Sequence, residues 1–128
     1  MNSYILDAQH LLRDIGDGAE TSTATETAID FVAANADDFK AVFHVSALDT
    51  ADANETYTLS VEVDAAAGFS SAVEVGSVTV TATGIYEIPL SASFVENLES
   101  GAIKMRAKAT LGGTTPSITY GAYLVPVV

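Results

Sequence analysis

The sequence predicts an all-β protein that folds as a single antiparallel β-sandwich with an extended N-terminal arm. Several segments alternate apolar and polar residues, which is typical of strands with one face toward a core. Turn-forming residues separate these segments by about 8–12 residues, as in β-sandwiches. No long helical segments alternate with the strands, which excludes a parallel α/β sheet. Periodicity does not reveal connection order, so immunoglobulin-like and jelly-roll sandwiches both remain open.

The N-terminal part is interpreted as an arm and loop over residues 1–26, followed by the sandwich domain over residues 27–128. Residues 3–15 fit both a helical stripe and a strand alternation, and we favour an extended arm. The alternative is that this segment forms the first strand of the sandwich. Residues 16–26 are small and polar and predict a loop.

Three strands are predicted in the first half of the sandwich, over residues 27–32, 39–48 and 56–64. A turn at residues 35–38 and a polar loop at residues 49–55 separate them. The third strand alternates most clearly. We expect it to bury Tyr57, Leu59, Val61 and Val63 and to expose Thr58, Ser60, Glu62 and Asp64.

Further along the chain, Phe69 is a predicted anchor in a linker of small residues at 65–71. The apolar alternation of the next strand changes phase at Gly76 and Ser77, which predicts a bulge. Residues 85–90 form a strand whose Pro89 favours an edge position. Residues 94–100 are interpreted as a short loop or one helical turn that buries its apolar side chains, Phe94, Val95 and Leu98.

The last predicted feature is an antiparallel hairpin made by residues 102–111 and 117–125 around a turn at 112–116. Its first strand carries three of the five basic residues of the chain on one face: Lys104, Arg106 and Lys108. This basic stripe has two interpretations. It docks onto an acidic partner or a neighbouring subunit, or it pairs across strands with Asp and Glu and protects a sheet edge.

Composition limits the partners. The chain has 17 acidic and 5 basic residues and a formal net charge of -12. Such a surface repels the phosphates of nucleic acids and of anionic lipids, so we expect neither a nucleic-acid nor a membrane partner. We expect neither a secretion signal nor a membrane span, because the first residues lack a basic region and no apolar run is long enough. There is no cysteine for disulfides or thiolate metal sites.

Catalytic patterns are also missing from the sequence. The two histidines, His10 and His44, lie far apart in sequence, and neither belongs to a nucleophile motif. No glycine-rich phosphate loop is present. The oxygen-rich segments 14–17 and 49–55 offer calcium ligands but are more typical of turns. We therefore expect no enzyme activity, no cofactor and no metal.

Four segments together resemble the jelly-roll cement proteins, also called decoration proteins, of tailed-phage capsids. The first, residues 61–75, ends a strand in small residues before a Gly-Phe-Ser-Ser-Ala turn, and the second, residues 84–90, contains Tyr-Glu-Ile-Pro. The third, residues 104–120, joins the basic stripe to a Gly-Thr-Thr-Pro turn and a final strand, and the fourth is the apolar finish GAYLVPVV. The order of these motifs carries the resemblance, which spans about half the chain.

The resemblance implies a jelly-roll fold and a structural function. Such proteins are made in the host cytoplasm, sit on the outer surface of the virion as homotrimers, and bind neighbouring copies of the major capsid protein. They use no cofactor and no catalysis. On this basis we expect the arm and the basic stripe to contact the capsid or a sister subunit, through Tyr4, Ile5, Leu6, Leu11, Leu12, Lys104, Arg106 and Lys108.

The alternative function is a phage tail, fibre or surface adhesion module that binds a receptor or a glycan. That function favours exposed aromatic residues at loop tips, because flat rings stack on sugars. Here Tyr86, Tyr120 and Tyr123 fall in predicted strands, and the chain contains no Trp. The sequence therefore favours the cement protein over the adhesion module.

Overall fold

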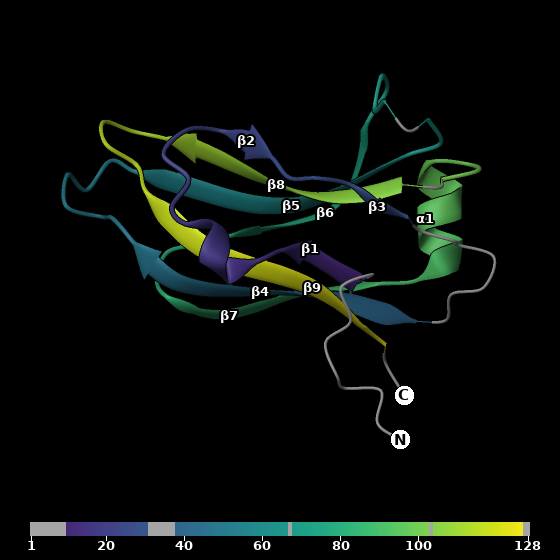
Figure 1. The fold of residues 1–128 in the computed structure, drawn as a ribbon, viewed down its shortest axis with the longest axis horizontal. Coiled ribbons are helices and arrows are strands. Elements are labelled where there is room, and N and C mark those ends of the chain that lie inside the picture. Colours follow the sequence, from purple (N-terminus) through teal and green to yellow (C-terminus); the bar gives the residue numbers. More distant parts are fainter. Residues whose placement is uncertain (1–9, 31–37, 67, 103, 127–128) are drawn as a thin grey trace.

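The computed structural model describes residues 10–30, 38–66, 68–102 and 104–126. These residues form two antiparallel sheets packed face to face (Figure 1). Sheet A has the order β1-β9-β4-β7, and sheet B has the order β2-β8-β5-β6, with β3 also pairing with β8. The expected all-β sandwich is confirmed. The bounds in sheet A are β1 Leu11–Arg13, β9 Ile118–Pro126, β4 Phe39–Leu48 and β7 Gly84–Leu90. In sheet B they are β2 Ala24–Thr25, β3 Ile29–Asp30, β8 Lys104–Gly112, β5 Thr56–Asp64 and β6 Val73–Thr79.

The strand order is nested, and this distinguishes the two sandwich types that periodicity left open. The first strand pairs with the last, β2 and β3 pair with the second-last, β4 pairs with β7, and β5 pairs with β6. Each strand of the first half therefore finds its counterpart in reverse order in the second half. This winding is that of a jelly roll, in which the chain crosses repeatedly between the two sheets.

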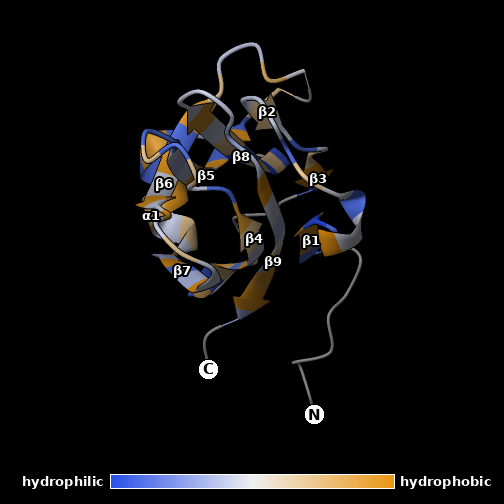
Figure 2. Ribbon diagram, turned by 90° about the vertical axis from the view of Figure 1, so that its left-hand side faces the viewer, coloured by the Kyte–Doolittle hydropathy of each residue, from blue (hydrophilic) through white to orange (hydrophobic). Residues whose placement is uncertain are grey.

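The core lies between the sheets and is built by the alternation that the sequence shows. The side chains of β4 and β5 alternate so that one face of each strand fills the interior. Figure 2 views the sandwich along its strands, with hydrophobic and hydrophilic residues interleaved. The largest fully buried side chains come from both sheets: Tyr120, Phe43, Leu59, Met105 and Ile118.

Two predicted strands, 39–48 and 56–64, have the bounds observed for β4 and β5. The prediction that Ser60, Glu62 and Asp64 are exposed on the other face of β5 is wrong, however. Ser60, Glu62 and Asp64 are 2%, 8% and 3% exposed. Neighbouring side chains and the link to β6 cover them, and hydrogen bonds or ion pairs offset the cost of burial.

The bulge and the edge strand are found close to their predicted places. Between β5 and β6 the register passes from Val61 opposite Gly76 to Glu62 opposite Glu74, so β6 contains one extra residue there. Pro89 lies in β7, which is an edge strand of sheet A. An edge tolerates proline because the strand needs hydrogen bonds on one side only.

The segment after β7 forms a helix, α1 (Ala92–Leu98), capped by Ser91, whose side chain accepts a hydrogen bond from the amide of Phe94 at 3.2 Å. The prediction that its three apolar side chains are buried is wrong for two of them. Val95 is fully buried, but Phe94 and Leu98 are 46% and 44% exposed. A two-turn helix presents one face to the sandwich, and Phe94 and Leu98, four positions apart, share another.

The predicted C-terminal hairpin is wrong. Its two strands are β8 and β9, which belong to different sheets: β8 pairs with β5, and β9 pairs with β4. The five residues 113–117 cross from one sheet to the other, and such a link can span the roughly 10 Å between packed sheets. Gly113 permits the crossing, because its φ is 103° and an added Cβ would lie 2.6 Å from the Cα of Glu55.

The arm and loop predicted over residues 1–26 are not separate from the sandwich in their described part. Leu11–Arg13 form β1, Ala24–Thr25 form β2, and Glu20 bridges to Ile118. The alternative interpretation, a first strand of the sandwich, is therefore correct for residues 11–13. Pairing with β9 satisfies backbone groups that an arm would leave to solvent. Residues 1–9 lie outside the described residues.

Candidate functional site

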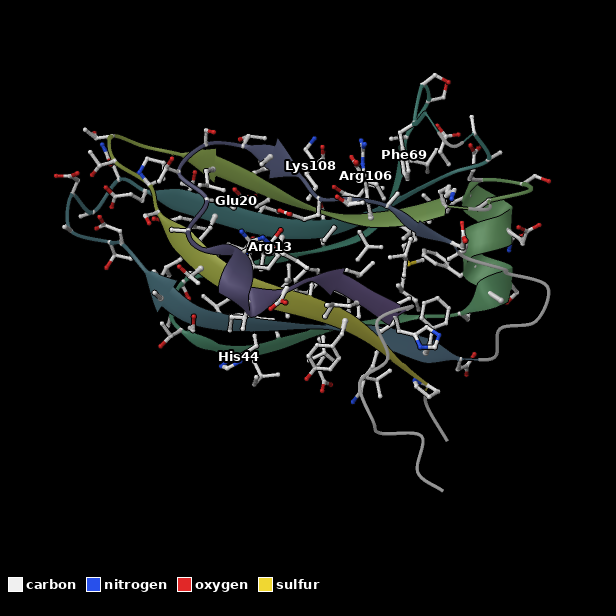
Figure 3. All side chains as sticks on the ribbon, viewed as in Figure 1. Arg13, Glu20, His44, Phe69, Arg106 and Lys108 are labelled. Atoms are coloured by element: carbon white, nitrogen blue, oxygen red, sulfur yellow. The ribbon has the colours of Figure 1, made fainter. Side chains whose placement is uncertain are left out.

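The basic stripe lies on the outer face of sheet B, as the alternation of β8 predicts. Met105, Ala107 and Ala109 are buried, and the intervening basic side chains point outward. Figure 3 shows Arg106 and Lys108 on this outer side. The three basic residues therefore share one face, and the remaining question is what they contact.

Each basic residue of the stripe pairs with an acid of its own chain. Arg106 donates through Nε to Glu62 Oε1 at 2.8 Å, and its Nη2 lies 2.8 Å from the same oxygen. Lys108 Nζ lies 3.8 Å from Glu62 Oε2, and Lys104 pairs with Asp30. The geometry therefore favours cross-strand pairing within the sheet over a free docking stripe.

Phe69 completes this cluster on sheet B. Its ring lies 4.1 Å from the guanidinium carbon of Arg106, an attractive arrangement for a cation over an aromatic face. The link that carries Phe69 is held by Asp64, which accepts hydrogen bonds from the amides of Ala66 and Ser71. These bonds lower the pKa of Asp64. Phe69 is thus an anchor, as predicted, but it anchors on the outside of the sheet.

A second polar cluster lies between the sheets, at the edge where β1 faces β2 (Figure 3). Its centre is Arg13, whose guanidinium donates to the carbonyl oxygens of Tyr120 at 2.7 Å and Gly18 at 2.9 Å. Arg13 Nε lies 3.2 Å from Glu26 Oε2 and 3.9 Å from Glu20 Oε2. Arg13 is only 4% exposed, so the two carbonyl oxygens replace water at Nη1 and Nη2, whereas Nε has only the charge of the nearby acids.

Two groups beside Arg13, the Glu26 carboxyl and the Tyr120 hydroxyl, have raised pKa values. Burial and a hydrogen bond with Glu20 raise the pKa of Glu26 to about 7, against the opposing effects of Tyr120 and Arg13. Burial and the nearby Glu26 raise the pKa of Tyr120 above its ordinary value, and the Tyr120 hydroxyl donates to Glu26 at 2.9 Å. The cluster ties the N-terminal segment to β9. Sequence spacing did not predict it, because the four residues meet only through the jelly-roll pairing.

The predicted contact residues of the N-terminal segment divide into three groups. Tyr4, Ile5 and Leu6 lie outside the described residues. Leu11 is half-buried on β1, opposite Tyr123. Leu12 is 3% exposed and belongs to the core, so its predicted contact with the capsid or a sister subunit is wrong for this conformation.

The oxygen-rich segments considered for calcium act as turn formers. Asp14 accepts a hydrogen bond from Gly16 and caps the short helix η2 (Ile15–Asp17). Asp49 accepts one from Ala51 in the loop after β4. Over the described residues, no group of three or more acidic, histidine or cysteine side chains is placed to hold a metal ion. Those residues also contain no helix with the length and apolar character needed to span a membrane.

The outer face of sheet A differs from that of sheet B. The core takes alternate residues of β4, β7 and β9, so the others point outward, among them His44 (Figure 3). Exposed or half-exposed apolar residues occur in this outward set beside polar ones such as Lys40, His44 and Glu87, whereas the outward set of sheet B is polar and charged. We define the apolar face by its six apolar residues with partial or full exposure: Leu11, Ile15, Ile85, Pro89, Tyr123 and Val125.

Comparison with known proteins does not assign the chain to a family. No protein-family model matches it, and no curated protein matches it.

Proposed function

We propose that the chain is a structural virion protein that binds the outer surface of a phage capsid as a homotrimer and cements neighbouring copies of the major capsid protein. The observation that carries this proposal is the order of the four cement-protein motifs in residues 61–128, together with the nested strand order that the resemblance implies. A sandwich of this kind acts through its surface.

The placement of the two histidines supports a role without catalysis. His44 points outward from β4, and its neighbours in register are Ile85 and Gly121, which have no nucleophilic group. His10 is exposed and precedes β1. A hydrolase of the serine type needs a base within hydrogen-bond reach of a nucleophile, and neither histidine is described with such a partner.

Each contact between the protein and the capsid can be weak, because one trimer makes several such contacts at once. A trimer that spans several capsid subunits makes its second and third contacts at a high effective concentration. Every bound copy also favours the assembled shell, since ligand binding stabilises the state to which the ligand binds. The proposed protein therefore raises the stability of the shell without a large single interface.

The test uses capsids that lack this protein. Light scattering measures the molar mass of the free chain, and the purified chain is then added to the capsids, whose melting temperature is recorded. We expect a trimer that binds the shell to saturation and raises its melting temperature. A monomer that ignores the shell and binds a glycan instead contradicts the proposal and supports the adhesion module.

A further inference from the structure

The apolar face of sheet A is ordered in three rows by the strand register. In the first row, Ile15 lies over Gly121, whose missing Cβ would be 3.1 Å from the Cβ of Ile15, and His44 separates this position from Ile85. The second row is Leu11, Tyr123, Val42 and Glu87, and the third is Val125, Lys40 and Pro89. The second row crosses β1, β9, β4 and β7, and the other two cross β9, β4 and β7, so the apolar side chains share one sheet face with His44, Lys40 and Glu87.

This surface is exposed although it is apolar. Ile85 is 57% exposed and Ile15 is 38% exposed, and Pro89 is exposed as well. In Figure 2 the end of β9 next to the C-terminus is coloured hydrophobic. A sheet face that carries several exposed apolar side chains, opposite a polar face, is typical of a protein interface.

The apolar face carries no net formal charge from lysine or acidic residues. Its two charged side chains, Lys40 and Glu87, form an ion pair with 3.0 Å between Nζ and Oε2. The neutrality is notable in a chain of net charge -12. Neutral surfaces lose little solvation when they are covered, whereas unpaired charges resist burial.

Exposed acids border the apolar face. Asp14 and Asp17 flank Ile15, and Asp38 immediately precedes β4, two residues before Lys40. All five basic residues of the chain are among the described residues, and each forms an ion pair with an acid other than these three. The border of the apolar face is therefore negative and has no basic side chain of its own chain to balance it.

This charge distribution selects the partner. A second copy that met the face would bring its own acidic border against the first, and like charges at an interface border are unfavourable. A different protein with basic residues around an apolar centre is complementary. We propose that the apolar face of sheet A is the surface by which this protein docks on the capsid, on a site with an apolar centre and a border of Lys and Arg. This inference rests on the proposed function and adds the docking face and the chemistry of the partner site.

The first experiment compares two aspartate substitutions on opposite faces, using capsids that lack the protein. Ile85→Asp places a charge on the apolar face, and Thr110→Asp places one on the exposed outer face of β8. Circular dichroism and melting temperature verify that both variants fold. We expect Ile85→Asp to weaken capsid binding about tenfold or more and Thr110→Asp to leave it unchanged.

The second experiment tests the basic border through charge and salt. Asp17→Asn removes a negative charge at the apolar face, and Glu74→Gln removes one from exposed β6 on the opposite sheet. We expect wild-type affinity to fall as NaCl rises, and Asp17→Asn to weaken binding and reduce that salt dependence. Glu74→Gln should change neither. If the affinity of the wild type for the capsid does not change with NaCl, the proposal that Lys and Arg border the capsid site is wrong.

The outcomes separate the inference from the proposed function. If the wild type fails to bind the capsid, the proposed function is wrong and the inference fails with it. If the wild type binds but only Thr110→Asp loses affinity, or neither variant does, the inference is overturned and the function stands.

Two other occupants of the face would also overturn the inference. If Ile85→Asp abolishes self-association and leaves capsid binding intact, the occupant is a second copy. If deletion of residues 2–9 lowers the hydrogen-exchange protection of the amides of residues 85–88 in the edge strand β7 of the free protein, the occupant is the chain's own N-terminal segment.

Discussion

At the scale of single residues, Glu26 has a charge state that depends on its surroundings. It accepts a hydrogen bond from the Tyr120 hydroxyl, lies beside Arg13, and has the Glu20 carboxyl nearby. Burial disfavours the charged carboxylate more than Arg13 favours it, so the pKa is raised from 4.5 to about 7. The folded chain therefore binds a proton that the unfolded chain releases at lower pH.

The raised pKa gives a pH-dependent stability. Between about pH 4.5 and 7 the folded state holds more protons at Glu26 than the unfolded state, so this group lowers the free energy of unfolding as pH rises. Its stabilising contribution is complete below pH 4.5 and is lost as pH rises through 7. Glu26→Gln keeps a neutral side chain, and we expect it to remove this slope from urea denaturation curves measured across the range. The control is Glu74→Gln at an exposed position, which should keep the wild-type slope; an unchanged slope in Glu26→Gln would contradict the assignment.

At the scale of elements, the short strand β1 depends on two neighbouring residues with different roles. Leu12 packs in the core, and Arg13 is held by backbone carbonyls and by acids. Leu11, on the apolar face, is only half-buried. The three residues of β1 therefore connect the N-terminal segment to both the interior and the outer face of sheet A.

Alanine substitutions in β1 distinguish these roles. Leu12→Ala removes a buried side chain and should lower the free energy of unfolding by about 2–4 kcal/mol. Leu11→Ala removes a half-buried one and should cost less than about 1 kcal/mol. Urea denaturation measures both. Equal and small effects would show that β1 is not fixed on the sandwich in solution.

The ion pairs of the basic stripe on β8 should also contribute unequally to the free energy of unfolding. Arg106→Ala leaves Glu62, whose side chain is 11% exposed, without its closest partner and removes the contact with Phe69. We expect a loss of about 1–3 kcal/mol in the free energy of unfolding. Lys104→Ala removes a pair with Asp30, which is 83% exposed, and should cost less than about 0.5 kcal/mol. If both variants match the wild type in thermal and urea denaturation, the pairs contribute no stability and the docking interpretation of the stripe gains support.

Sequence patterns predicted the elements better than their partners. The bounds of β4 and β5 followed from alternation, because a half-buried strand needs apolar side chains at every second position. The burial of Glu62 and Asp64 did not follow, since it depends on Arg106 and on the link after β5. The predicted hairpin failed for a similar reason: a five-residue link permits either a hairpin or a crossing between sheets. Alternation also does not reveal that Leu12, rather than Leu11, faces the core.

At the scale of the whole molecule, negative charges far outnumber positive ones. Every basic residue forms an ion pair, and most acidic side chains in the described residues have no basic partner. Repulsion among these acids opposes the compact state, and salt screens it over a Debye length of about 8–10 Å.

We expect the melting temperature of the free protein to rise by roughly a few degrees when NaCl is increased from about 10 mM to 150 mM. Differential scanning calorimetry at constant pH measures the shift, and a matched series in sucrose separates charge screening from general exclusion of solute. A melting temperature that falls with salt would mean that the ion pairs outweigh the repulsion.

The nested pairing of strands has a consequence for biosynthesis. β4 needs β9 as well as β7, and β5 needs β8, so the sheets lack their central strands until the last part of the chain exists. A ribosome covers the most recently made residues in its exit tunnel, so neither sheet can be completed before β8 and β9 have left the tunnel. Folding of the sandwich must therefore wait for these two strands, and it proceeds at the slow rates typical of non-local topologies. A messenger cut short before the codons of β9 would yield a product with unpaired strand edges, which quality-control proteases degrade.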